Sequence, residues 1–257
     1  MIKETTETRI ADKLKVKIYE TRLLMGAYAA HDVSEKIKEL LSKQDFVNIV
    51  FAAAPSQNEF LAALSQNEEV EWSRINAFHM DEYIGLNKEA PERFGNFLKE
   101  RIFGRAPFHE VYYLDGNTGD PAMECRHYTD LLDSYPTDIV CMGIGENGHL
   151  AFNDPHVADF NDPQMVKVVS LADASRQQQV NDGCFARIED VPVSALTLTI
   201  PALLRAGAVY CIVPGINKAE AVYNTLHSGI KEAYPSTALR QHANATLYLD
   251  KNSSERL

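Results

Sequence analysis

The sequence predicts a three-layer α/β/α fold, in which helices cover both faces of a mostly parallel, Rossmann-like sheet. Short apolar runs typical of buried parallel strands recur along the chain. Helical patterns separate most of these runs, as they do in repeated strand–helix–strand units. The 257 residues are 45% apolar, which is enough for a large core. The composition does not change along the sequence in a way that would mark a domain boundary. We therefore expect a single domain over residues 1–257.

The first predicted elements are a strand, a helix and a second strand. Residues 13–19 alternate charged and apolar side chains, which is typical of a half-exposed edge strand. Residues 21–41 carry apolar side chains at helical spacing. Residues 46–54 form a nearly continuous apolar run, typical of a buried parallel strand. Further strands are expected at residues 74–78, 138–143, 166–171, 208–213 and 246–249.

Several residues mark where helices are expected to begin. Proline suits the first turn of a helix and aspartate caps it, which predicts helix starts at Pro91 and at Asp120 with Pro121. Ser56 and Glu59 have the spacing of a capping box, which would open another helix.

Charge, targeting signals and cysteine usage exclude several classes of partner. The formal net charge is −11 and no run of five lysines or arginines occurs, which disfavours nucleic acid and anionic membrane surfaces as partners. The first residues lack the apolar region of a signal peptide, and no apolar run approaches the ~18 residues of a membrane span. The four cysteines are far apart, as in proteins of the reducing cytosol. We therefore expect a cytoplasmic protein whose partner is a small molecule.

Ligands of open parallel sheets bind beyond the carboxyl ends of the strands, so the residues after each apolar run are informative. Ser56 follows the 46–54 run, at a predicted helix start whose free N–H groups would attract phosphate. Asp81 and Glu82 follow the 74–78 run, and adjacent carboxylates indicate either a functional pair or a solvated acidic loop. Lys218 opens an apolar helix, where it opposes the helix dipole unless an anion lies beside it. It is therefore either a phosphate ligand or a solvated surface lysine.

Residues 143–155, GIGENGHLAFNDP, form the densest segment of unusual residues. Its glycines, Gly145 among them, let the backbone approach a ligand. The spacing is not that of a dinucleotide fingerprint, because no helical pattern opens there. His149 and the distant His156 offer too few ligands for a metal ion. We expect His149 to be an acid/base histidine held by Asp154.

Four motifs resemble the glucosamine-6-phosphate deaminase/isomerase family in their order and spacing. They are MDEYIGL at residues 80–86, GIGENGHLAFNDP at 143–155, VPVSALTLTI at 191–200 and PGINKAEAV at 214–222. The similarity runs over nearly the whole chain. The same superfamily contains 6-phosphogluconolactonases, and the MDEY form resembles the deaminase branch. The resemblance implies one sugar-phosphate deaminase/isomerase-like domain that converts glucosamine 6-phosphate and water to fructose 6-phosphate and ammonia, without metal or organic cofactor.

The resemblance also implies roles for individual residues. Asp81 would move a proton between C2 and C1 of the opened sugar, His149 would assist ring opening, and Asp154 would orient the imidazole. Ser56 and Lys218 match phosphate-binding positions of the family. Glu82 and Gly145 are expected to contribute to the same substrate site.

The sequence departs from the family pattern at four places. Asn147 stands where the family usually carries aspartate, and an amide replaces the hydrogen bond but not the charge. Asp154 stands where the family carries glutamate, so its reach to His149 is one methylene shorter. Residues 53–55, Ala-Ala-Pro, replace threonine and glycine in the phosphate loop, and proline has no N–H to donate. The family's phosphate-binding arginine aligns with Asp182, and Arg176 replaces it only if the backbone shifts.

Two other functions stay open at this point. In a 6-phosphogluconolactonase-type hydrolase, His149 would activate water for attack on a lactone. In a non-catalytic sugar-phosphate sensor, Asn147 and the altered phosphate loop would have removed turnover. The segment after Tyr83 is a candidate lid. The sequence does not set the oligomeric state, and the resemblance leaves a homo-oligomer open.

Overall fold

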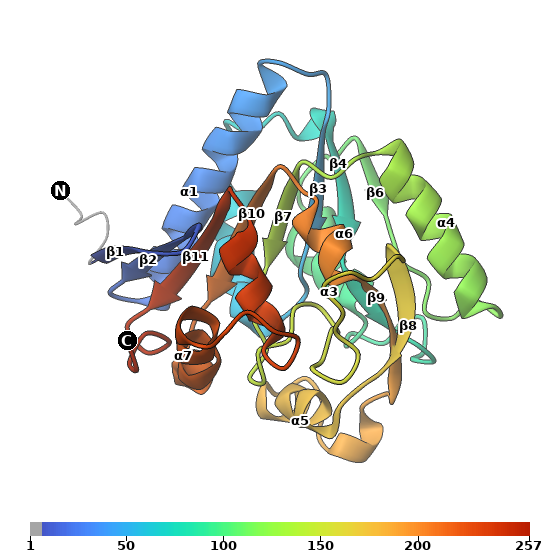
Figure 1. Cartoon of the computed structure of the whole chain (residues 1–257). Coiled ribbons are helices and arrows are strands. Elements are labelled where there is room, and N and C mark those ends of the chain that lie inside the picture. The colour runs from blue at the N-terminus through green and yellow to red at the C-terminus, as the bar shows by residue number, and fades with distance from the viewer. Residues whose placement is uncertain (1–6) are drawn as a thin grey trace.

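The computed structural model describes residues 7–257 and confirms the α/β fold with a mostly parallel central sheet. The larger sheet has eight strands in the order β1-β2-β11-β10-β7-β3-β4-β6 (Figure 1). Only β1 and β2 pair antiparallel within it, and every other neighbouring pair is parallel. The strands are β1 (Glu7–Ala11), β2 (Leu14–Tyr19), β3 (Val47–Phe51), β4 (Ile75–His79), β6 (Glu110–Tyr112), β7 (Ile139–Met142), β10 (Ala208–Val213) and β11 (Ala245–Asp250).

A second, three-stranded antiparallel sheet lies outside the parallel one. It consists of β5 (Asp81–Tyr83), β9 (Ser194–Leu198) and β8 (Val166–Ser170), in that order. The strand expected at residues 166–171 therefore forms, but it does not join the parallel sheet. Only Met80 separates β4 from β5. The chain thus passes from the carboxyl end of the large sheet directly into the small one.

Helices cover both faces of the large sheet because its strands alternate apolar side chains between the two faces. Ile49 and Phe51 of β3 pack into one core with α1, α2 and α3, whereas Val50 packs into a second core with α4, α6 and α7. The helices are α1 (Arg22–Leu41), α2 (Asn58–Ser65), α3 (Phe94–Leu98), α4 (Pro121–Ser134), α5 (Asp173–Asn181), α6 (Ile200–Leu204) and α7 (Ala219–His227). None of the helices within residues 7–257 has the length and apolar character to cross a membrane.

Two helix starts lie where the sequence predicts them and two do not. Thr21 caps α1 by accepting a hydrogen bond from the backbone N–H of Leu24, and Asp120 caps α4. The prediction for Pro91 is wrong by three residues, since α3 begins at Phe94. The capping box at Ser56 is also wrong. A short helical turn, Pro55–Gln57, precedes α2, and no side-chain hydrogen bond caps either one.

The prediction that residues 13–19 form an edge strand is wrong as well. Strand β2 is paired on both sides, with β1 and β11, and β1 occupies the edge in the part of the chain that the structure describes. Leu14, Val16 and Ile18 are buried, while Lys15 is exposed. The alternation therefore reflects two differently exposed faces of a paired strand.

Candidate functional site

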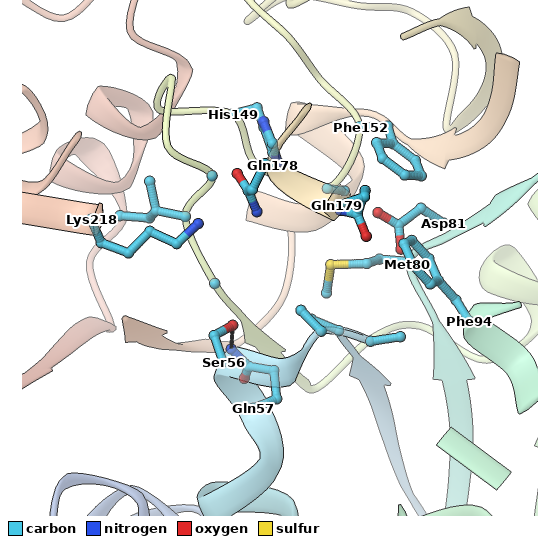
Figure 2. Close-up of a pocket in the computed structure, with 17 residues that line it drawn as sticks. Ser56, Gln57, Met80, Asp81, Phe94, His149, Phe152, Gln178, Gln179 and Lys218 are labelled. Carbon is cyan, nitrogen blue, oxygen red and sulfur yellow. Dashed lines mark hydrogen bonds between the residues drawn. The ribbon is translucent and has the colours of Figure 1, made fainter. Parts of the chain in front are cut away.

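A pocket lies beyond the carboxyl ends of β3, β4, β7 and β10 (Figure 2). Part of this pocket is open to solvent. Five of the expected residues, from four separate junctions, line it: Ser56, Asp81, Gly145, His149 and Lys218. Lys218 and Ser56 lie toward one end, and Asp81 lies toward the other (Figure 2). The parallel topology therefore assembles the chemistry that the sequence distributes over about 160 residues.

His149 is held through its Nδ1 atom. Nδ1 lies 2.8 Å from Oδ1 of Asn147 and 2.9 Å from Oγ of Ser175, while Oδ1 of Asp154 is 3.4 Å away. Asn147 donates from Nδ2 to Asp154, over 2.8 Å, so its Oδ1 is turned toward the imidazole. Two acceptors facing Nδ1 select the tautomer that is protonated there. Nε2 is then the ring nitrogen available to a ligand.

Asp154 is fully buried at the centre of this network. It accepts hydrogen bonds from Asn147, from Ser175 and from the backbone N–H of Ala172, the last over 3.0 Å. Burial alone would raise the pKa of Asp154, but the contacts with His149, Ser175 and Asn147 outweigh it and hold the pKa below its usual range. The carboxylate is therefore ionised and accepts hydrogen bonds only.

Gly145 makes room for the imidazole. A Cβ atom at this position would lie 2.1 Å from Cε1 of His149 and 2.3 Å from both ring nitrogens. The backbone N–H of Gly145 donates to the carbonyl of His149 over 2.9 Å, so it does not point at a ligand. The expected contribution of Gly145 to the site thus takes the form of close packing against His149.

Asp81 lies in β5 and faces the pocket from a nearly dry position, with 6% of its surface exposed. Burial raises its pKa well above the ordinary value, and the neighbouring charge of Glu82 raises it further. A carboxyl group of this kind is suited to take up and return a proton. The interpretation as a solvated acidic loop is excluded, because Asp81 and Glu82 are both buried.

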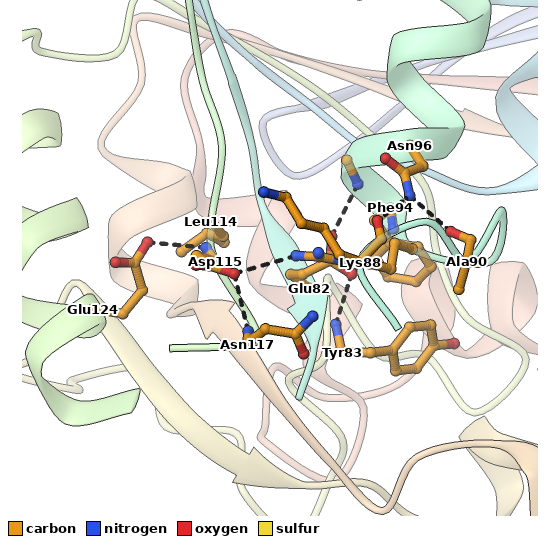
Figure 3. Close-up of polar contacts among 12 residues, drawn as sticks. Glu82, Tyr83, Lys88, Ala90, Phe94, Asn96, Leu114, Asp115, Asn117 and Glu124 are labelled. Atoms are coloured by element: carbon orange, nitrogen blue, oxygen red, sulfur yellow. Dashed lines mark hydrogen bonds and ion pairs between the residues drawn. The ribbon is translucent and has the colours of Figure 1, made fainter. Parts of the chain in front are cut away.

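Glu82 is absent from the lining of the pocket and makes instead the polar contacts drawn in Figure 3. Successive side chains of a strand point to opposite sides, so Glu82 points away from Asp81. Its fully buried carboxylate accepts hydrogen bonds from the backbone N–H groups of Tyr83, Phe94 and Gly95, at 2.9, 3.1 and 3.0 Å. Nε of Arg93 lies 3.6 Å from it. Burial raises the pKa of Glu82, and these donors oppose the rise.

Lys218 is 5% exposed, which excludes the interpretation as a solvated surface lysine. Burial lowers its pKa, and the charges of Asp182 and Glu146 act in the opposite direction. Among the described residues that line the pocket, Lys218 is the only lysine or arginine. Oγ of Ser56, near the same end, accepts a hydrogen bond from Gln57. An anion in this part of the pocket would therefore meet one buried cation and a hydroxyl.

Arg176 does not replace the arginine that the sequence lacks at Asp182. Its guanidinium donates to the backbone carbonyls of Ile188 and Val191 and pairs with Asp173. It is absent from the described lining of the pocket.

The sequence analysis missed the contribution of α5. Ser175, Gln178 and Gln179 of this helix are buried, and both glutamines line the pocket. Oε1 of Gln178 accepts a hydrogen bond from the backbone N–H of Glu146, which ties α5 to the histidine loop. One signal was available, since serine and glutamine occupy the i, i+3 and i+4 positions where a covering helix usually carries apolar residues. Phe94 and Phe152 complete the wall and stack with 5.4 Å between ring centroids.

The residues 7–257 contain no group of three or more histidine, cysteine, aspartate or glutamate side chains that could hold a metal ion.

Comparison with known sequences finds one family over most of the chain. A family model described as glucosamine-6-phosphate isomerases/6-phosphogluconolactonase matches residues 21–248. A glucosamine-6-phosphate deaminase of Bacillus thuringiensis is 32% identical over 217 residues, which cover 84% of this chain and 80% of that protein. A glucosamine-6-phosphate deaminase of Bacillus anthracis has the same identity and coverage.

Solved structures agree with this finding. A monomeric glucosamine-6-phosphate deaminase superposes with a TM-score of 0.85 at 29% identity, covering 93% of this chain and 98% of the other. A 6-phosphogluconolactonase of Thermotoga maritima has a TM-score of 0.76 at 20% identity, covering 93% and 100% of the two chains. The second likeness concerns the fold alone.

Proposed function

Because the chain belongs to the enzyme family of glucosamine-6-phosphate isomerases and 6-phosphogluconolactonases, we propose that it deaminates and isomerises an amino-sugar 6-phosphate. The reaction is glucosamine 6-phosphate plus water to fructose 6-phosphate plus ammonia. One observation carries the proposal: a buried carboxyl group with a raised pKa, Asp81, shares a pocket with His149, whose Nδ1 is occupied by protein acceptors. A lactone hydrolase has no need for a base that faces C2.

The proposed steps begin with ring opening. Nε2 of His149 takes the proton of the anomeric hydroxyl as the bond between C1 and the ring oxygen breaks, and it returns that proton to the ring oxygen. The positive charge that imidazole carries in between is stabilised by ionised Asp154 through Asn147 and Ser175. The product of this step is the open-chain aldehyde.

Asp81 carries out the isomerisation. Its carboxylate removes the proton from C2, and the electron pair forms a C1–C2 double bond while the C1–O double bond becomes a single bond to O1, which takes a proton from the 2-ammonium group of the sugar. Asp81 then delivers its proton to C1 as the nitrogen lone pair forms a C2–N double bond. The resulting iminium carbon at C2 adds water and releases ammonia, which leaves the ketone of fructose 6-phosphate. Burial raises the pKa of Asp81, which makes its carboxylate a stronger base than that of an exposed aspartate and suits it to this transfer.

We assign the phosphate of the substrate to the end of the pocket that holds Lys218 and Ser56 (Figure 2). A buried ammonium group is a strong partner for an anion, since neither group is screened by water. The other end, at Asp81, then receives C1 and C2. This assignment gives the sugar one orientation in the pocket.

The sensor hypothesis loses its main support. Asn147 takes a place in the network around His149, since it donates to Asp154 and accepts from His149. The amide therefore preserves the hydrogen bonds that hold the imidazole, although it lacks the charge of an aspartate.

Ammonia release from the purified protein tests the proposal. Glucosamine 6-phosphate and galactosamine 6-phosphate are the two amino-sugar substrates, and 6-phosphogluconolactone is run in parallel with opening of the lactone as the readout. Ammonia from either amino sugar, lost in Asp81→Asn, supports the deaminase. Opening of the lactone without ammonia would establish the hydrolase instead, and tight binding of all three without turnover would establish the sensor.

The proposal includes a cytoplasmic location, with which four cysteines without disulfides agree. A homo-oligomer stays a prediction, and sedimentation of the purified protein tests it.

A further inference from the structure

Asp154 orients His149 through other side chains and not through a hydrogen bond of its own. Oδ1 of Asp154 lies 3.4 Å from Nδ1 of His149, beyond the usual range of a hydrogen bond between nitrogen and oxygen. Asp154 has one methylene fewer than a glutamate, and the closest protein atoms to Nδ1 belong to neutral groups. A buried carboxylate that makes no hydrogen bond to the imidazole needs an intermediary to orient it.

Ser175 occupies the space between the two groups. Its Oγ contacts Oδ1 of Asp154 and lies 2.9 Å from Nδ1 of His149. A hydroxyl has one hydrogen, and an ionised carboxylate only accepts. The hydrogen of Ser175 therefore goes to Asp154, and a lone pair of Oγ is left for the proton on Nδ1. The direction of both hydrogen bonds follows from the charge of Asp154.

Asn147 forms a second bridge of the same kind, but its position makes it a local one. It lies two residues before His149 and also accepts a hydrogen bond from the backbone N–H of His149, over 3.1 Å. Ser175 comes from α5, 26 residues away in sequence, and 1% of its surface is exposed. It therefore connects the imidazole of His149 to α5, which Gln178 also ties to the histidine loop through the backbone N–H of Glu146.

We propose that Ser175 is a positioning residue for His149, which spans the gap left by the short side chain of Asp154 and joins the catalytic loop to α5. The kinetic consequences of this inference rest on the proposed deaminase function. The structural consequence, a selected tautomer of His149, does not.

The kinetic test uses Ser175→Ala and a compensating change. Loss of Oγ should lower kcat roughly 10- to 100-fold, the usual value of one hydrogen bond to a charged group, with KM changed less than about twofold. In Asp154→Glu/Ser175→Ala the longer carboxylate can occupy the vacated space and reach Nδ1 directly. The double variant should recover most of the lost kcat. A kcat of Ser175→Ala equal to that of the unmodified protein would overturn the proposal, as would a double variant no faster than Ser175→Ala.

Ser34→Ala is the matched control. Ser34 is also fully buried in a helix, and its hydroxyl also makes two hydrogen bonds, to the carbonyl of Ala30 and with Asn67. Ser34→Ala should lower the melting temperature about as much as Ser175→Ala does, but it should leave kcat unchanged. An equal decrease in kcat in Ser34→Ala and Ser175→Ala would show that loss of the Ser175 hydroxyl acts through the stability of the fold and not through His149.

A measurement without substrate separates this inference from the proposed function. Nitrogen-15 NMR of the imidazole of His149 should show the proton on Nδ1, and a larger fraction of the Nε2-protonated tautomer in Ser175→Ala. The fraction should be larger still in Asn147→Ala/Ser175→Ala. If the unmodified protein turns over no amino-sugar phosphate, the proposed function fails while this spectrum still decides the role of Ser175. Identical tautomer populations in all variants would overturn the proposal.

Discussion

Asp81 and Glu82 are neighbours in one strand, yet their carboxylates lie on opposite sides of it. Asp81 faces the pocket, and Glu82 is fully buried behind the strand against three backbone N–H groups. The donors to Glu82 include the N–H groups of Phe94 and Gly95 at the start of α3. One carboxylate thus joins the strand that carries the proposed base to the helix that carries Phe94, part of the pocket wall.

Replacing Glu82 by glutamine should shift the pH dependence of kcat/KM. The charge of Glu82 raises the pKa of Asp81, so removing it should lower that pKa. Asp81 would then stay ionised to lower pH, and the acidic limb of the profile should move toward acid. Burial lowers the pKa of His79 on β4 and raises the pKa values of the phenols of Tyr83 and Tyr128, so each of these groups favours its neutral form. Arg93, 3.6 Å from Glu82, keeps its charge in the variant.

Glu82→Gln should also change how the free energy of unfolding depends on pH. Burial raises the pKa of Glu82, so the unmodified protein loses stability as the pH rises above the ordinary glutamate pKa, and the neutral variant does not. Glu68→Gln, at an exposed position, is the control and should change neither quantity. An acidic limb that stays in place in Glu82→Gln would contradict the influence of Glu82 on Asp81.

Replacing Asp81 by asparagine should abolish exchange of the C2 proton and lower kcat by about 10²–10⁴-fold, with substrate binding largely kept. It should also stabilise the protein at neutral pH. The folded-state pKa of Asp81 is raised, so the stability of the unmodified protein is complete below the ordinary value of 3.8 and falls as pH rises toward the raised pKa. Asp81→Asn has no carboxyl group at this position, so its free energy of unfolding at neutral pH should be higher by ~1.4 kcal/mol for each unit by which folding raises the pKa of Asp81.

Melting temperatures measured across pH check this second effect. The difference between Asp81→Asn and the unmodified protein should be positive at neutral pH and should shrink as the pH approaches 4. A constant difference would mean that Asp81 does not titrate in this window, and the assignment of Asp81 as base would lose its electrostatic argument.

Replacing Gly145 by alanine should displace the imidazole of His149. The added Cβ would lie 2.1 Å from Cε1, so the ring has to move away from the place where Nδ1 contacts Asn147 and Ser175. A misplacement of about 1 Å can cost roughly 10²-fold in rate, and we expect at least that loss of kcat. Gly119→Ala is the control, since its Cβ would meet no atom within 4 Å. Equal kcat values in the two variants would contradict the packing of His149 on Gly145.

Replacing Lys218 by alanine should weaken binding through the phosphate. The hydrogen bond of an ammonium group to an anion is worth about 1.5–3 kcal/mol, so KM for glucosamine 6-phosphate should rise roughly 10- to 100-fold. Inhibition by the sugar without its phosphate should change little. Lys88→Ala, at an exposed position, is the control. If the phosphorylated and dephosphorylated sugars lost affinity alike, Lys218 would support the structure of the pocket instead.

The sequence by itself was enough to place most of the site. The carboxyl ends of parallel strands meet at one edge of a sheet, so Ser56, Asp81, His149 and Lys218 could be grouped from the runs that precede them. The alternation of strands and helices along the chain was sufficient to predict the fold class, because consecutive strands joined by helices form a parallel sheet. These features depend on local patterns and on a topology that such patterns nearly determine.

Tertiary structure decided which of the neighbouring polar residues face the pocket. Glu82 adjoins Asp81 in sequence but points the other way, because the pairing of β5 with β9 sets which side of the strand faces the pocket. Strand β2 shows the same effect, since its alternation is compatible with an edge strand until β1 pairs beside it. Ser175, Gln178 and Gln179 join the site from a helix whose position depends on packing between segments distant in the sequence. A chain reveals its periodicity locally, whereas pairing partners and packing neighbours exist only once it has folded.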